Sequence, residues 1–133
     1  KKVYLRYKNF LPEGSITHKL LKNYTIGILS VCLERSVFER FKFDSTFNIV
    51  GDFDFFIKVS LYEKIGCIQT PLAYYRIHEN NYSLNQVKLH IDELKRWCDN
   101  NKILNSKKGC SLIYQKFYIF KLMIKYLIKK IKS

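Results

Sequence analysis

Apolar and polar positions alternate along the chain with two different periods. Residues 84–98 and 111–132 repeat their apolar side chains every three to four positions, which predicts two amphipathic helices. Three other stretches are rich in β-branched and aromatic residues and predict strands, at 3–7, 24–33 and 67–77. The run at 24–33 is apolar almost throughout, so we expect this strand to be buried on both faces.

Shorter signals predict what lies between these elements. Helices are expected from about residue 17 to 23, from 35 to 41, and from Asp52 to Gly66, where a glycine suits the end of a helix. Pro71 lies inside the last predicted strand and favours an edge position. The alternation of strands and helices predicts an α/β fold that ends in an amphipathic helix.

Composition narrows the class of protein and of partner. The chain has 133 residues, of which 47% are hydrophobic and 26% charged, and these values are typical of a globular domain rather than a disordered one. The net charge of +13 predicts attraction to an anionic partner, such as nucleic acid, anionic lipid or a diphosphate. Four cysteines occur without a C-x-x-C pair, which argues against a zinc site and favours a reducing, cytoplasmic setting.

The basic residues gather in the C-terminal stretch. Lys121, Lys125 and Lys129 recur every four residues beside an apolar face, and this pattern predicts a helix that lies on an anionic membrane surface. The stretch is interrupted too often by lysine for a transmembrane span. The alternative is a helix packed on the domain, with its lysines in water. We therefore divide the chain into a domain at 1–104 and a linker with a basic helix at 105–133.

A series of motifs occurs in a fixed order between residues 14 and 97. GSITHKLLKNYTI precedes SVCLERSVFER, which is followed by FKFDSTFNIVGDFDFFIKVS and then by PLAYYRIHENNYS. In this order and spacing the motifs resemble the second half of the family 2 glycosyltransferases. The resemblance implies a partial GT-A domain, the acceptor-side half, with mixed strands and helices. The chain begins at Lys1 rather than at a methionine, and we expect an inactive fragment without the nucleotide-binding half.

The resemblance also implies a reaction. A sugar would pass from a nucleotide-diphosphate donor to a saccharide or lipid-linked acceptor in bacterial surface polysaccharide synthesis, by an inverting single displacement at the inner membrane face. Such a transfer needs a carboxylate base for the acceptor hydroxyl and positive charge for the leaving diphosphate. The resemblance implies Mg²⁺ or Mn²⁺ in the full-length enzyme, with none bound to this fragment.

Asp52, Arg76 and His78 match functional positions of the family. Asp52 matches the base, although Gly51 stands where a glutamate is common, and its alternative role is a helix N-cap. Arg76 would fork onto the donor diphosphate, and its alternative is a surface ion pair. His78 would approach the diphosphate or ligate its metal, and its alternative is a loop histidine with one backbone hydrogen bond.

Asp54 and Asn81 are further candidates for contact with the donor or acceptor. Asp54 completes an Asp-x-Asp pattern with Asp52, but a helix and YYRIH follow this pair, as in the later acidic motif of the family. Its alternative role is an early-helix residue favoured by the helix dipole. Asn81 lies in the loop after His78, where it would line the site or simply form a turn.

The alternative function is a non-catalytic basic module that binds nucleic acid or an anionic membrane surface. The charge favours it, as do the aromatic residues that alternate with basic ones in YYRIH and IYQKFYIF. No recognised nucleic-acid-binding motif occurs, so we expect no specific nucleic acid partner. A half-domain would expose sheet edges and apolar surface, through which it can self-associate.

Overall fold

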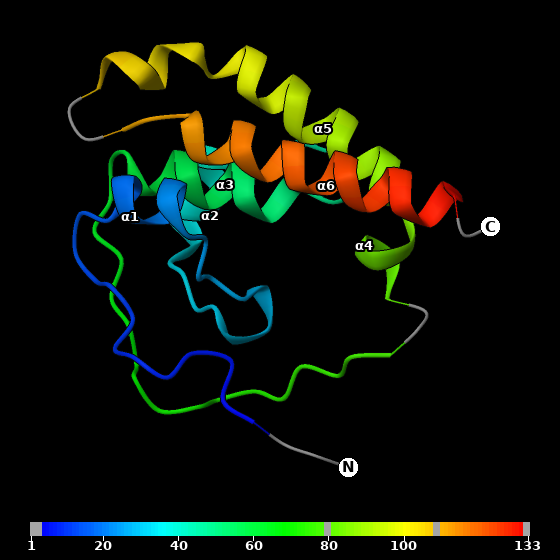
Figure 1. Cartoon of the computed structure of the whole chain (residues 1–133). Helices are drawn as coiled ribbons and strands as arrows, with labels where there is room; N and C mark the ends of the chain where they lie inside the picture. Colours follow the sequence, from blue (N-terminus) through cyan, green and yellow to red (C-terminus); the bar gives the residue numbers. More distant parts are fainter. Residues whose placement is uncertain (1–3, 79–80, 108–109, 132–133) are drawn as a thin grey trace.

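The structure, a computed structural model, describes residues 4–78, 81–107 and 110–131, and within them the regular secondary structure is helical apart from an isolated bridge (Figure 1). Extended or turned chain lies before residue 17, at residues 23–27 and at residues 67–78. The helical elements in chain order are α1 (Thr17–Lys22), the 3-10 turn η1 (Ile28–Ser30), α2 (Arg35–Phe41), α3 (Gly51–Ser60), α4 (Tyr82–Asn85), α5 (Val87–Asn100), the 3-10 turn η2 (Lys102–Ser106) and α6 (Ile113–Ile131).

The two longest helices, α5 and α6, lie side by side and run in opposite directions (Figure 1). Both follow the apolar period of the sequence, and Trp97 of α5 is buried in one cluster with Ile119 and Leu122 of α6. The division of the chain into 1–104 and 105–133 stays a prediction. In the structure, α6 contributes to the same core as α5.

Hydrogen bonds tie the short helix α1 to both α3 and α6. The Thr17 hydroxyl donates to the backbone carbonyl of Ser60 at 2.7 Å, which joins the start of α1 to the end of α3. The Gln115 side chain of α6 donates to the backbone carbonyl of Leu21 at 2.5 Å. Leu21 and its neighbour Leu20 are buried in the shared core, so α1 packs between α3 and α6.

A second, smaller cluster lies between α2 and α3. Phe55 and Val59 of α3 pack against Val37 and Phe41 of α2. The Phe43 ring stacks on the Phe55 ring with 4.3 Å between their centroids. The apolar residues of α3 therefore pack in two directions, some toward α5 and others toward α2.

The predicted α/β fold is wrong, and with it the partial GT-A domain. Among the described residues no strand ladder forms, and the stretches predicted as strands, 3–7, 24–33 and 67–77, are extended or turned chain from residue 4 onward. An isolated bridge joins Gly14 to Ile65, with N···O distances of 2.7 and 3.0 Å. Gly14 has φ +86°, a conformation that a glycine adopts at little cost.

The strand prediction was wrong because strand propensity has an effect only where a neighbouring strand is present. β-Branched and aromatic residues favour a pleated, half-buried surface, and a strand also needs a partner for its backbone N–H and C=O groups. The described residues supply no such partner. Ile28, Leu29 and Ile68 are instead 51%, 61% and 70% exposed.

The predicted helices are confirmed, with shifted ends. The helix expected from Asp52 to Gly66 ends at Ser60, and the chain then turns toward the bridge at Ile65. The helix expected at 84–98 is divided at Gln86 into α4 and α5. The helix expected at 111–132 is α6.

Candidate functional site

Asp52 is the second residue of α3, at the helix end where backbone N–H groups lack carbonyl partners. Its carboxylate is half-buried, and Oδ1 accepts a hydrogen bond from the backbone N–H of Phe53 at 2.7 Å. Burial raises the pKa of the Asp52 carboxyl, although backbone hydrogen bonds and the charge of Arg6 act in the opposite direction. Asp52 is not the N-cap of α3, because that position is Val50.

Glu93, on α5, fixes the start of α3. Its carboxylate accepts hydrogen bonds from the backbone N–H groups of Asn48, Ile49 and Val50 at 2.8, 2.9 and 3.2 Å. Burial raises the pKa of Glu93, but these hydrogen bonds outweigh it and the pKa lies below its ordinary value. The buried Glu93 carboxylate, on another helix, thus accepts hydrogen bonds from N–H groups at the start of α3, as the side chain of a capping residue usually does.

Asp54 is buried and points into the core rather than to the surface. Its Oδ1 accepts a hydrogen bond from the indole N–H of Trp97 at 2.9 Å, and its Oδ2 pairs with the Lys58 ammonium at 2.6 Å. Its side chain therefore joins α3 to α5. Because Glu93 and Trp97 lie one turn apart on α5, this helix fixes the first turn of α3 at two points, and Asp52 is on that turn.

Residues from the extended stretches complete the surroundings of Asp52. The Tyr24 ring lies edge-on to the Phe53 ring, with 5.2 Å between centroids. The Tyr24 hydroxyl is buried and has no hydrogen-bond partner among the described residues. Burial raises the pKa of Tyr24 strongly, and the charge of Asp52 raises it further. Arg6 supplies the nearby positive charge, since it lowers the pKa of Asp52.

The second predicted group, Arg76, His78 and Asn81, lies on the stretch between α3 and α4. Asn81 organises it: its Oδ1 accepts the backbone N–H of His78 at 2.6 Å, and its Nδ2 donates to the Tyr75 hydroxyl at 3.2 Å and to the Arg76 carbonyl at 3.4 Å. The Arg76 and His78 side chains are exposed. Within the described part of the chain, no hydrogen bond or ion pair links this group to Asp52.

The predicted metal contact of His78 has no supporting ligands in the described ranges. No three histidine, cysteine, aspartate or glutamate side chains there gather in a group that could hold a metal ion. The four cysteines are free thiols, and Cys98 is the buried one among them.

The lysines predicted to contact a membrane lie on the exposed surface of α6. Lys121, Lys125 and Lys129 are all exposed. In the part of the chain that the structure describes, none of them forms an ion pair with a carboxylate. Over the same residues, no helix is both long enough and apolar enough to cross a bilayer.

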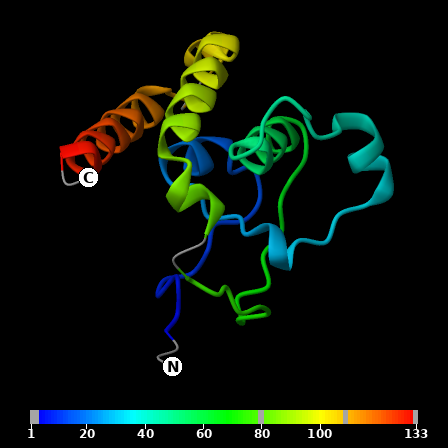
Figure 2. The ribbon, with the colours of Figure 1, turned by 90° about the vertical axis from the view of Figure 1, so that its right-hand side faces the viewer.

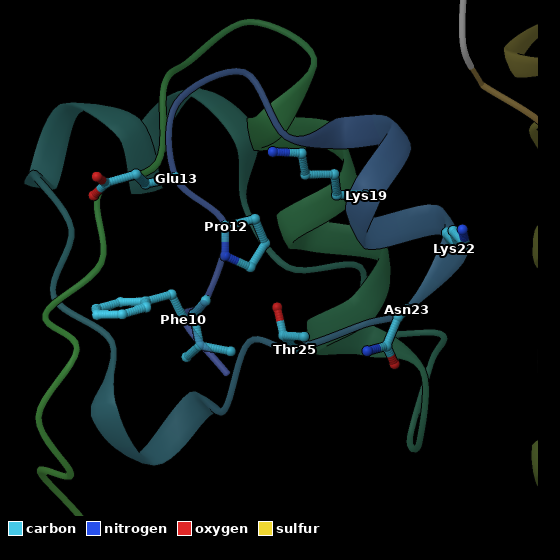
Figure 3. Close-up of a pocket in the computed structure, with 8 residues that line it drawn as sticks. Phe10, Pro12, Glu13, Lys19, Lys22, Asn23 and Thr25 are labelled. Carbon is cyan, nitrogen blue, oxygen red and sulfur yellow. The ribbon is translucent and has the colours of Figure 1, made fainter. Parts of the chain in front are cut away.

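An open pocket of about 570 Å³ lies between the N-terminal stretch and α1 (Figure 3). Its walls come from the chain before α1, from α1 itself and from the residues that follow it. Asp52 is not part of its lining. The lining residues are Phe10, Leu11, Pro12, Glu13, Lys19, Lys22, Asn23 and Thr25.

Comparison of the chain with protein-family models, with curated proteins and with solved structures gives no match. The sequence predicted Asp52 as a candidate base, and it did not predict that Glu93, Tyr24 and Arg6 act on Asp52 or on the start of its helix. A signal existed for Glu93, because it lies one turn before Trp97 on the strongly periodic helix α5. The sequence offers no comparable signal for Tyr24 or Arg6, which lie on irregular chain.

Proposed function

We propose that this chain carries the catalytic base of a glycosyltransferase. The enzyme transfers a sugar from a nucleotide-diphosphate donor to a saccharide or lipid-linked acceptor in bacterial surface polysaccharide synthesis. The observation that carries the proposal is the state of Asp52, a half-buried carboxylate whose pKa is raised by burial, on a helical turn that α5 fixes at two points. The motif series between residues 14 and 97 adds the chemical class.

The Asp52 carboxylate accepts the proton of the acceptor hydroxyl as the hydroxyl oxygen attacks the anomeric carbon of the donor. The new C–O bond forms as the bond from that carbon to the diphosphate breaks. The nucleoside diphosphate leaves with the electron pair, and single displacement inverts the anomeric centre. Burial raises the pKa of the carboxyl, and a raised pKa makes the carboxylate a stronger base.

Arg76 and His78 act on the donor side in this proposal. The Arg76 guanidinium is exposed and unpaired within the described residues, so its fork is open to phosphate oxygens. A divalent cation would offset the charge of the leaving group. The described residues do not fit such an ion, because no three histidine, cysteine, aspartate or glutamate side chains gather among them.

The proposal places the reaction in the cytoplasm, at the inner face of the membrane. The four cysteines are free thiols, and thiols stay reduced in the cytoplasm. The compartment would also hold the soluble donor.

The test compares Asp52→Asn with Asp92→Asn in the natural gene product. Both substitutions remove one carboxylate at constant size, and Asp92 is exposed on α5. Release of nucleoside diphosphate is measured over a panel of nucleotide sugars, with bacterial lipid and saccharide fractions as acceptors. We expect Asp52→Asn to lower the rate by roughly 10²- to 10⁴-fold, the usual contribution of a general base, and Asp92→Asn to leave it unchanged.

The alternative function, a non-catalytic basic module, predicts a different result. No nucleotide sugar would then be turned over, and Asp52→Asn would behave like Asp92→Asn in every assay. Equal turnover by the two variants would remove Asp52 from the mechanism. Salt-sensitive binding to random oligonucleotide that survives replacement of Lys121, Lys125 and Lys129 by glutamine would favour the basic module, because these C-terminal lysines would then not account for it.

A further inference from the structure

Helix α6 has an inner face that packs on the body of the protein. Gln115, Ile119 and Leu122 are buried on this face, and they contact the core formed with α5 and α1. Figure 2 shows α6, orange to red, on the outer side of α5, with its C-terminal half extending past the rest of the fold. The contacts of this inner face hold α6 against the core, but they bury few of the apolar residues of the helix.

The opposite face of α6 is also apolar, and it is open to solvent. Residues three or four apart lie on one side of a helix, so six of the exposed apolar residues of α6 form one continuous stripe, which we call the outer face. The fractions exposed are large for side chains of this kind. The outer face consists of Phe117 (58%), Phe120 (58%), Ile124 (43%), Leu127 (56%), Ile128 (49%) and Ile131 (84%).

Lysines border this outer face on both sides. By helical spacing, Lys121 and Lys125 lie along one border, and Lys116 and Lys130 along the other. The Lys121 ammonium lies 4.8 Å from the centre of the Phe117 ring, so its aliphatic stem runs beside the apolar stripe while its charge remains in water. The sequence has no aspartate or glutamate after Asp99, and among the described residues Lys121, Lys125 and Lys129 form no ion pair.

We propose that the outer face of α6 lies in the surface of an anionic lipid bilayer, parallel to the membrane plane. An apolar stripe between two rows of lysine fits the boundary between acyl chains and negatively charged headgroups. A second copy of this chain is a poor occupant, because it would bring two lysine-bordered faces together in a protein of charge +13. The inference does not depend on the transferase reaction.

The experiment is flotation of the full chain with vesicles of phosphatidylcholine alone, or of phosphatidylcholine with roughly 30 to 40% phosphatidylglycerol. This share of anionic lipid gives a surface charge density on the order of that of a cytoplasmic leaflet. We expect the chain to float with the anionic vesicles at low salt, and to be released in part as salt is raised. Tryptophan fluorescence of Ile128→Trp reports insertion, because the natural Trp97 is fully buried and lies away from the outer face.

Two matched double variants separate the outer face from general surface apolarity. Ile124→Glu with Ile128→Glu places two charges on the stripe, and Ile68→Glu with Ile103→Glu makes the same chemical change at exposed positions elsewhere. We expect the first pair to lower partition at least tenfold and the second to leave it within about twofold of the parent. Replacing Lys121, Lys125 and Lys129 by glutamine should weaken partition about fivefold per lysine.

The proposal is overturned if the parent chain does not float with anionic vesicles, or if both double variants float equally well. It is also overturned if sedimentation shows a dimer that the stripe variant abolishes while vesicles bind neither protein. Circular dichroism controls for folding. If the stripe variant unfolds, the glutamine variant and the fluorescence of Ile128→Trp decide the matter, since neither introduces a charge into α6.

Discussion

At the junction of α3 and α5, buried polar groups are paired across the helices, whereas the stretch from residue 67 to 78 leaves apolar groups in solvent. Glu93 and Asp54 are 3% and 1% exposed, and each accepts hydrogen bonds from the other helix or the chain before it. Tyr74 and Ile77, by contrast, are 88% and 62% exposed. What separates the two regions is whether a partner element exists within the described chain.

The difference has a consequence for stability and for function. A junction with paired carboxylates holds the first turn of α3, and thus Asp52, in one position. A stretch without ladder hydrogen bonds opens at little cost, so its side chains are free to rearrange around a ligand or another element. We therefore expect substitutions at the junction to change the free energy of unfolding, and those on the stretch to change it little.

The largest effect is expected from Trp97→Ala. Trp97 is fully buried between α3 and α6, and its indole N–H is bonded to Asp54. Loss of this side chain leaves a cavity and an unpaired carboxylate oxygen, and we expect the free energy of unfolding to fall by about 3–5 kcal/mol. Urea denaturation measures it. Trp97→Phe, which mainly removes the N–H, should cost about 1–3 kcal/mol, and equal costs for the two variants would contradict this division.

Glu93→Gln should have the next largest effect. Glutamine keeps one acceptor oxygen but places an N–H₂ group against backbone donors, so we expect a loss of about 1–3 kcal/mol at neutral pH. The pKa of Glu93 is lowered in the fold, so its contribution is present above the unfolded pKa and is lost as pH falls through the folded one. Denaturation curves from pH 7 to pH 3 should show the two proteins converging, and a constant gap would be inconsistent with this role.

Sequence patterns predicted the helices better than the contacts between them. The periods at 84–98 and 111–132 reflect an apolar face, and such a face is a property of the helix itself. The strands predicted at 24–33 and 67–77 do not form in the structure. Strand formation depends on a second strand, which local composition does not encode.

For the candidate site too, the sequence predicted a residue on a helix but not the residues that contact it from elsewhere in the chain. Asp52 could be found because it lies within a motif and at the start of a helix. Glu93 acts on residues more than forty positions away, and the partners Tyr24 and Arg6 lie on irregular chain, where no period fixes the direction of a side chain. Long-range pairings of this kind become visible only in the folded chain.

Asp52→Asn should act on stability in the direction opposite to Glu93→Gln. Burial raises the pKa of Asp52, so its ionised form costs stability at neutral pH, and the cost disappears as pH falls below the unfolded pKa. Because the group is partly in water, we expect a gain of less than about 1 kcal/mol from asparagine at pH 7. Thermal melts at pH 7 and pH 4 check it. A clear loss of stability at pH 7 would mean that the carboxylate serves the fold rather than chemistry.

The smallest effect is expected from Tyr74→Ala. Tyr74 is 88% exposed, and removing an exposed side chain away from caps and buried pairs changes stability by no more than about 0.5 kcal/mol. Amide hydrogen exchange should agree, with the stretch from residue 67 to 77 exchanging far faster than α3 and α5. If Tyr74→Ala costs as much as Trp97→Phe, or if these amides are protected like those of α3, the stretch is packed in solution. It would then be covered by another element or another chain, and the contrast with the α3–α5 junction would no longer hold.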